Sequence, residues 1–169
     1  MSSVTPKKYC LVKEDQKSIE GRTLYRIRAL IDLPSIEKDS LGGYVESEEN
    51  LSHEGTCWIG GEAYVYHQAK VMDHAIVQGA ASMRHEAKIK GYAILEDNAL
   101  LEEQATIEEH AHVMDSVILR GEVHVGGQAV VREYVCCYDH ILVQGDAVLQ
   151  GCGVLIGDGF FDHGTIEIN

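Results

Sequence analysis

Six side chains that could bind a phosphate-bearing aromatic molecule recur at related positions in the sequence. They are Tyr66, His67, Arg84, His85, Arg120 and Tyr138. The two tyrosines and the two arginines are separated by multiples of eighteen residues, and the two histidines are eighteen residues apart. Tyrosine rings stack on bases, and guanidinium groups neutralise phosphates. If a period of eighteen brings these side chains together, they predict a ligand pocket for a nucleotide-like molecule. The alternative is a rim of hydrogen bonds and ion pairs between subunits.

His112 is the best candidate for a general base, because it interrupts a series of apolar residues eighteen apart. The alternative is a histidine that packs between subunits. We predict neither a metal site nor a cofactor. The five cysteines form no C-x-x-C pair, and the column of His67 and His85 lacks a third protein ligand.

A six-residue repeat must position these side chains. Eighteen consecutive six-residue units run from Cys57 to Gly164 without an insertion. The first position is small or aliphatic, and the third is Val, Ile, Leu, Met, Cys or Phe. The fifth and sixth positions are rich in Gly, Asp, Glu, His, Asn and Gln, which suit a bend. Each unit therefore predicts a short strand with positions 1 and 3 inward, followed by a bend.

Three bends of about 120° close a triangle in eighteen residues, and stacked triangles form a parallel β-solenoid. We predict an all-β parallel β-helix of about six coils over residues 57–169. Residues 1–56 lack the repeat and are expected to form a small N-terminal β cap. Two strands are expected there, in KYCLVKED and TLYRIRALIDL.

The pattern V-x-x-x-A-x over residues 57–164 resembles the hexapeptide repeat of the left-handed parallel β-helix superfamily. This resemblance implies a left-handed coil and, commonly, a homotrimer. The leader strings GRTLYRIRAL and LGGYVESEENLSHEG resemble those of uncharacterised bacterial and bacteriophage members. The superfamily includes γ-class carbonic anhydrases, which have two histidines five residues apart, and acyltransferases, which have a loop that interrupts the repeat. This sequence has neither feature.

Position 2 of every third unit lies in one column, and the three columns define three faces of the triangle. The first face carries Trp58, Ile76, Ile94, His112, Val130 and Val148. The second face carries Tyr64, Ser82, Leu100, Ile118, Cys136 and Val154. The third face carries Lys70, Lys88, Thr106, His124, Leu142 and Phe160. Because the first two columns are apolar and point outward, we expect them to form the interface of a homotrimer, with a dimer as the alternative.

Charge and composition limit the possible partners. The net charge is -13, and residues 57–169 hold six Lys/Arg against seventeen Asp/Glu. So acidic a body argues against direct binding of nucleic acid. The sequence has no apolar run long enough for a membrane span and no apolar signal segment, so we expect a cytoplasmic protein, in the host cytoplasm if a phage encodes it.

These observations favour a non-catalytic, oligomeric β-helix binding protein. It would act on a host protein or sequester a small nucleotide-like molecule at subunit interfaces. The alternative is an acyltransferase-like enzyme that uses an acyl-CoA donor.

Overall fold

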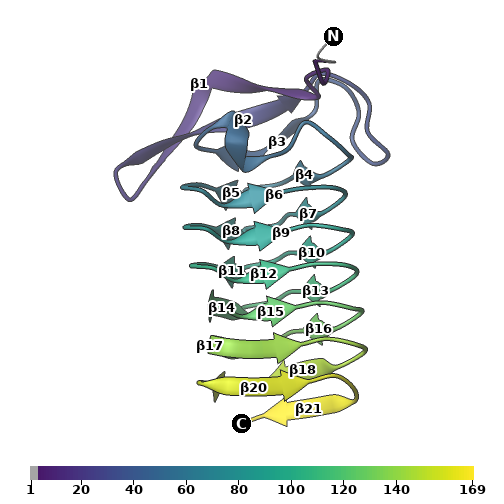
Figure 1. The fold of residues 1–169 in the computed structure, drawn as a ribbon. Helices are drawn as coiled ribbons and strands as arrows, with labels where there is room; N and C mark the ends of the chain where they lie inside the picture. Colours follow the sequence, from purple (N-terminus) through teal and green to yellow (C-terminus); the bar gives the residue numbers. More distant parts are fainter. Residues whose placement is uncertain (1–3) are drawn as a thin grey trace.

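The computed structural model describes residues 4–169, and a β-hairpin caps a tall stack of short strands (Figure 1). The hairpin consists of β1 (Tyr9–Ile19) and β2 (Arg22–Ala29), which pair in antiparallel fashion. Glu20 and Gly21 form its two-residue turn, and both have positive φ, as a tight hairpin turn requires. Both strands expected before the repeat are therefore present. No helix within these residues is long and apolar enough to cross a membrane.

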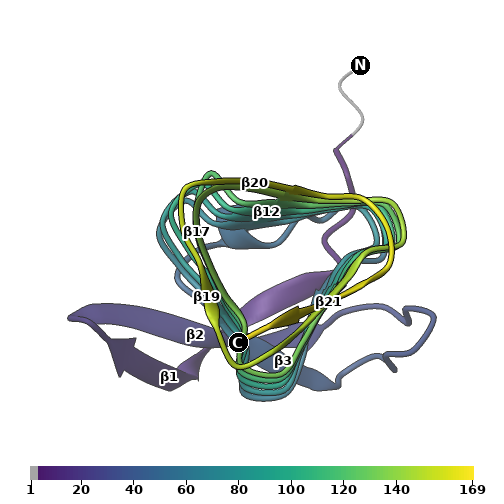
Figure 2. The ribbon, with the colours of Figure 1, turned by 90° about the horizontal axis from the view of Figure 1, so that it is seen from below.

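The stack is a parallel β-solenoid with a triangular cross-section (Figure 2). The first face consists of β4 (Trp58–Ile59), β7 (Ile76–Val77), β10 (Ile94–Leu95), β13 (His112–Val113), β16 (Val130–Val131), β18 (Val148–Gly151) and β21 (Thr165–Ile168). The second face consists of β3 (Leu41–Val45), β5 (Tyr64–Val65), β8 (Ser82–Met83), β11 (Leu100–Leu101), β14 (Ile118–Gly121), the start of β17 (Cys136–Val143) and β19 (Val154–Leu155). The third face consists of β6 (Lys70–Val71), β9 (Lys88–Ile89), β12 (Thr106–Ile107), β15 (His124–Val125), the end of β17 and β20 (Asp158–Phe161).

Successive coils stack with a constant offset of eighteen residues through most of the chain. Ile76 pairs with Ile94, and Leu100 pairs with Ile118. The last turn is one residue shorter, because Val148 pairs with Thr165. The period read from the sequence therefore sets the register of the sheets.

The solenoid has about seven turns rather than the six expected. The additional turn comes from both ends of the repeat, because β21 adds a strand to the first face and the segment assigned to the cap adds pairings to the second and third faces. Tyr44 pairs in parallel with Tyr64, and Leu51 forms a parallel bridge with Val71. A short 3-10 helix, η1 (Glu48–Asn50), lies between these two pairings. The offset here is twenty residues, which explains why the six-residue pattern does not reveal this turn.

The core is a column of alanine and larger aliphatic side chains from the first and third positions of the units. The alanines from Ala63 to Ala147 and the aliphatic residues from Val65 to Leu149 are almost completely buried. Burial of these side chains provides the main favourable contribution to folding.

The fifth position of every unit from Gly61 to Gly157 has a positive φ. Glycine holds eight of these positions, at 61, 79, 91, 121, 127, 145, 151 and 157. The other nine are His67, Asp73, His85, Asp97, Glu103, Glu109, Asp115, Glu133 and Asp139. The left-handed conformation makes the bend and is strained for most residue types, which accounts for glycine at eight of these positions and for aspartate or histidine at six of the others.

Several fifth-position side chains also bind the next coil. Asp73 accepts a hydrogen bond of 3.0 Å from the backbone N–H of Gly91, and Asp115 accepts one of 2.8 Å from Glu133. Asp97 and Asp139 make the same contact with residues eighteen positions later. Part of the strong negative charge therefore satisfies backbone donors at the corners.

Replacing Asp115 with alanine is expected to lower the free energy of unfolding by about 1 kcal/mol, because the N–H of Glu133 loses its acceptor. Asn at this position tolerates the left-handed conformation and retains an acceptor, so D115N should change stability less. Urea titration of D115A, D115N and the exposed-site control D146A checks this order. Equal stability of D115A and D146A would contradict it.

Candidate functional site

The two arginines of the predicted ligand set flank a buried carboxylate on the second face. The Glu102 side chain is 1% exposed. Arg84 donates from Nε to Glu102 Oε2 at 2.5 Å, and Arg120 donates to Glu102 Oε1. The three residues occupy successive coils of one column. Much of the positive charge of the two guanidinium groups is therefore neutralised inside the chain.

The tip of the β1–β2 hairpin covers the upper end of this column. Tyr66 is 1% exposed and donates from Oη to Glu20 Oε2 at 3.1 Å. Arg84 donates to Glu20 Oε1 at 2.6 Å and to Tyr66 Oη at 3.3 Å. The hydrogen bond with Tyr66, followed by that with Glu102, raises the pKa of Arg84, and burial raises the pKa of Tyr66. Sequence analysis placed Tyr66 on an outer face, whereas the structure packs it beneath the hairpin.

Arg120 and Tyr138 remain accessible at the lower end of the column. The Arg120 side chain is about half exposed, and its guanidinium carbon lies 5.8 Å from the centre of the Tyr138 ring. Burial against the sheet, followed by the neighbouring Cys136 thiol, raises the pKa of Tyr138. These two neighbouring side chains retain the stacking surface and the positive charge expected of the ligand set.

His67 and His85 occupy fifth positions at the corner between the second and third faces. Their rings stack with centroids 5.1 Å apart and planes inclined by 11°. Nδ1 of His67 accepts from the backbone N–H of His85 at 3.2 Å, and Nδ1 of His85 accepts from Glu103 at 3.3 Å. The imidazoles thus serve the same role as the corner aspartates, which requires Nδ1 to be unprotonated.

Stability is expected to fall between pH 7.5 and 5.5 through His67. Burial, followed by the positive charges of Arg22 and His85, lowers its pKa, although Glu46 and Glu20 oppose the shift. Below the unfolded-state pKa of about 6.5, the unfolded chain binds a proton that the folded chain binds less readily, so folding loses free energy as the pH falls.

The variant H67N keeps an acceptor and tolerates the left-handed backbone. Its melting temperature should therefore decrease less than that of the wild type over this pH range. Thermal unfolding followed by circular dichroism measures both slopes. A variant whose slope equals that of the wild type would show that His67 is not the titrating group.

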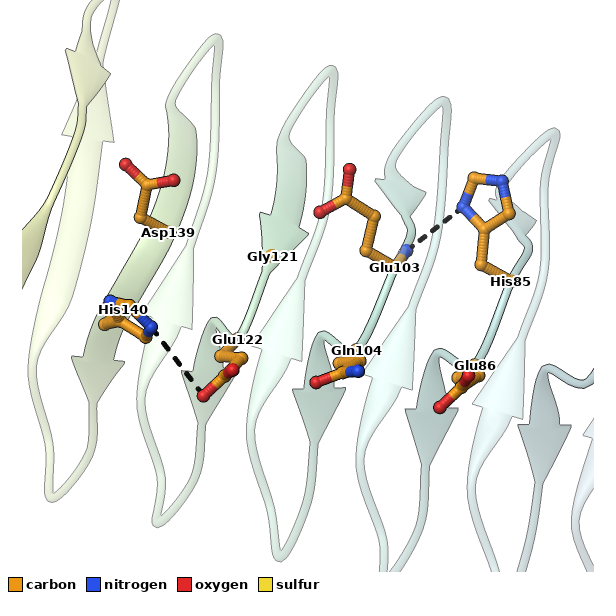
Figure 3. Close-up of a pocket in the computed structure, with 8 residues that line it drawn as sticks. All are labelled: His85, Glu86, Glu103, Gln104, Gly121, Glu122, Asp139 and His140. Atoms are coloured by element: carbon orange, nitrogen blue, oxygen red, sulfur yellow. Dashed lines mark hydrogen bonds and ion pairs between the residues drawn. The ribbon is translucent and has the colours of Figure 1, made fainter.

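A cleft of about 430 Å³ lies at the same corner, below His85 (Figure 3). Its lining residues are His85, Glu86, Glu103, Gln104, Gly121, Glu122, Asp139 and His140. Two rows of side chains project from successive coils, and Gly121 leaves a gap in one row between Glu103 and Asp139. His140 Nε2 lies 3.8 Å from Glu122 Oε2. His85 is the only member of the predicted ligand set that lines this cleft.

The chemistry of this cleft differs from that of a phosphate site. The carboxylates that line this cleft attract cations and repel phosphates. Within residues 4–169, no three His, Cys, Asp or Glu side chains are close enough together to hold a metal ion.

A larger groove, of about 670 Å³, lies between the first face and the loop that joins β2 to β3. Leu33, Pro34 and Ile36 of the loop form one wall, and Ile76 and Ile94 form the other. Sequence analysis placed the Trp58 side chain outward as part of an open column. In the structure Trp58 is only 2% exposed, since Gly42 packs so closely that an added Cβ would lie 2.8 Å from the indole ring.

His112 lies on the first face just below this groove and is hydrogen bonded to a carboxylate. Its Nε2 is 2.5 Å from Glu96 Oε1, and Gln78 donates to Glu96 Oε2 at 2.6 Å. His112 and Glu96 are both partly buried, and Glu96 also lines the groove. This arrangement orients the imidazole, as a supporting carboxylate does for a general base.

The remaining residues of the predicted interface lie along the first two faces. Ile76, Ile94, Val130 and Val148 are partly buried on the first face. On the second face, Tyr64, Leu100 and Ile118 are partly buried, and Val154 is 53% exposed. Tyr64 packs beside Tyr66 under the hairpin, so the accessible part of the second column begins in the coils that follow Tyr64.

Sequence analysis did not assign roles to Glu102, Glu96 or the loop around Ile36. Glu102 lies in the same eighteen-residue column as the two arginines, so the period itself brings the three residues together. Glu96 contacts His112 across sixteen residues, and the loop lies outside the repeat, so no periodic signal identifies them.

Comparison of the chain with protein-family models and with curated proteins finds no match. The structure therefore classifies the protein at the level of its fold, an all-β parallel β-solenoid with a β-hairpin cap.

Proposed function

We propose that this protein is a non-catalytic, oligomeric β-helix binding protein that self-associates through its first face. We further propose that it belongs to the hexapeptide-repeat superfamily and coils in the left-handed sense. The expected assembly is a homotrimer, with a dimer as the alternative. If a phage encodes the protein, it acts in the host cytoplasm.

The observation that carries this proposal is the apolar, weakly charged surface of the first face. Outward side chains at the second and fourth positions of this face include only three charged residues, Glu96, Arg132 and Glu167. A chain with a net charge of -13 can bring two copies together most easily where charge is scarce. The apolar column and the adjoining groove would lose contact with water in the assembly, which favours association.

The lower part of the second face supports binding of a small nucleotide-like molecule. Arg120 and Tyr138 lie together and are accessible, and His85 lies at the adjoining corner. Arg84 is less suitable, because its side chain is 23% exposed, against 46% for Arg120. The proposed ligand site therefore consists of a tyrosine and an arginine on the second face, with His85 at its corner with the third face.

Native mass spectrometry of the purified protein tests both parts of the proposal. We expect species at multiples of 18.6 kDa, with a captured small molecule that appears after denaturation. A monomer without additional mass would contradict both parts. An oligomer without additional mass would support the proposed assembly and contradict the proposed captured ligand. Retention of a second protein in place of a small molecule would replace the proposed ligand class.

The alternative is an acyltransferase-like enzyme with His112 as the general base. The contact between His112 and Glu96 favours it, because the carboxylate orients the imidazole beside an apolar groove. Calorimetry with acetyl coenzyme A distinguishes the two functions. Saturable binding, together with turnover that is lost in H112N, would establish the enzyme. The proposed binding function expects neither result.

A further inference from the structure

Lys8 is a buried charged residue that the proposed function does not use. It is 1% exposed, and the structure gives three partners for its ammonium group. Nζ donates to the backbone carbonyls of Glu54 at 3.3 Å and Gly55 at 3.4 Å, and it lies 3.1 Å from Cys57 Sγ. Among residues 4–169, no carboxylate forms an ion pair with it. An ammonium group buried without a carboxylate is costly unless its neighbours compensate.

Within residues 4–169, Cys57 is the side chain to which this ammonium is hydrogen bonded, and it is completely buried. Its Sγ lies 3.6 Å from the carbonyl oxygens of Ser52 and Val71 and 3.7 Å from that of Glu54. The pKa of the Cys57 thiol is raised overall, because burial outweighs the opposing effect of the Lys8 ammonium, which favours the thiolate. A neighbouring cation that stabilises the thiolate makes a cysteine more nucleophilic.

Cys137 provides the internal comparison. It is as buried as Cys57, and burial, followed by the adjacent Cys136, raises its pKa to about 12. In the part of the chain that the structure describes, it lies beside a second thiol and is not hydrogen bonded to an amine. The pairing of a buried thiol with a buried amine therefore distinguishes Cys57 from the other buried cysteine.

The surrounding structure holds the Lys8 and Cys57 side chains together. The backbone N–H of Lys8 donates to His53 Nδ1 at 3.3 Å, and the Tyr9 ring stacks on His53 with centroids 4.3 Å apart. Tyr9 Oη donates to the Leu51 carbonyl at 2.7 Å. These contacts fix the start of β1 against the segment that leads into the first repeat unit. Lys8 Nζ and Cys57 Sγ are therefore held close to each other.

We propose that Lys8 and Cys57 form an oxidation-sensitive modification site, in which a peroxide joins the two side chains through an N–O–S bridge. The bridge would tie the cap to the first repeat unit across 49 residues of sequence. This inference is independent of the oligomer and of its ligand.

The chemistry requires two molecules of hydrogen peroxide. In the first step the Cys57 thiolate attacks one peroxide oxygen, the O–O bond breaks, and the departing hydroxide takes a proton from the Lys8 ammonium. The products are a sulfenic acid, a neutral amine and water. In the second step another peroxide removes one hydrogen from the amine and one from the sulfenic acid as the N–O bond forms, which releases two waters. Sulfur and nitrogen are oxidised, and four peroxide oxygens become three waters and the bridging oxygen.

The loop of residues 52–55 packs against the pair, because its carbonyl groups contact Lys8 Nζ and Cys57 Sγ. Ser52, Glu54 and Gly55 of this loop also line an outer groove of about 460 Å³. Peroxide is little larger than water, so a small local opening of the loop gives it access to Sγ. Cys57 should therefore react more slowly than the exposed Cys152 but should form a different product.

Peptide mapping of peroxide-treated protein, purified at full length, tests this site. We expect a crosslinked pair of peptides that contain Lys8 and Cys57, with about 14 Da added to their summed mass, and its loss on treatment with a thiol reductant. The crosslink should raise the melting temperature by about 5 to 10 °C, as closure of a long loop does. The variants K8R and C57S should form no crosslink and show no such increase.

The same peptide map can also contradict the proposed crosslink between Lys8 and Cys57. Oxidation of Cys57 to sulfinic or sulfonic acid without a crosslink would overturn the proposal, as would a Cys57 that stays unmodified under prolonged treatment, long after Cys152 is fully oxidised. If K8R fails to fold, C57S and the wild-type peptide map decide the question, because the crosslinked peptide is observed directly. Formation of a comparable crosslink by Cys137 would show that the pairing of Lys8 with Cys57 is not special.

Discussion

Replacing Glu102 with alanine is expected to lower the free energy of unfolding by about 3 kcal/mol. The Glu102 carboxylate is buried between two guanidinium groups, and its removal leaves the partly buried Arg84 with only the exposed Glu20 as a charged partner. Arg120 is half exposed, so water can solvate it, and its contribution to the loss should be small. The variant should also loosen the hairpin tip, because Arg84 links Glu102 to Glu20.

Chemical denaturation of E102A and E103A measures this difference with a matched control. Glu103 is the next residue, its side chain is half exposed, and it lies 3.8 Å from Arg120. Its replacement should cost less than about 1 kcal/mol. Similar losses in both variants would mean that the buried position of Glu102 has no special importance. If E102A is more stable than the wild type, the free-energy cost of burying the carboxylate exceeds the stabilisation from its two ion pairs.

Replacing Ile94 with glutamate is expected to dissociate the oligomer, with at least about a 100-fold increase in the dissociation constant. The side chain lies near the middle of the apolar column of the first face and lines the adjoining groove. Association would bury an unpaired carboxylate in each subunit, beside Glu96 of the same chain. Sedimentation velocity at micromolar concentration should show the monomer for I94E and the oligomer for the wild type.

The matched control for I94E is T106E. Thr106 occupies the same position of its unit on the third face, and its replacement makes the same change in charge. It should leave the sedimentation coefficient unchanged. Both variants should keep a wild-type circular dichroism spectrum, because their side chains point away from the core. Dissociation by T106E but not by I94E would place the interface on the third face.

Much of the solenoid could be predicted because its physical requirements recur every six residues. Inward positions must be small or aliphatic, and the fifth position must accept a positive φ, so substitutions at both are restricted in every unit. The same period predicted that Arg84 and Arg120 share a column. It also places Glu102 between them. The neutralisation of the two guanidinium groups by this carboxylate could therefore have been predicted from that column.

The cap could not be predicted in the same detail, because its contacts follow no period. Glu20 reaches Arg84 across 64 residues, and the packing of Gly42 against Trp58 depends on the path of one irregular loop. These contacts decide which outward positions are accessible, so Tyr66 and Trp58 were assigned to exposed columns. The additional turn was missed for a related reason, since Leu51 and Val71 pair with an offset of twenty residues rather than eighteen.

Hydroxyl-radical footprinting of the methionines tests self-association through the first face most directly. Met114 and Met72 occupy the fourth position of their units, on the first and third faces respectively, and both are partly buried in the single chain. Oxidation of Met114 should fall several-fold when the protein concentration is raised from the monomeric to the oligomeric range, whereas oxidation of Met72 should remain constant. Equal oxidation of Met114 at both concentrations, in a sample that has become oligomeric, would contradict an interface on the first face.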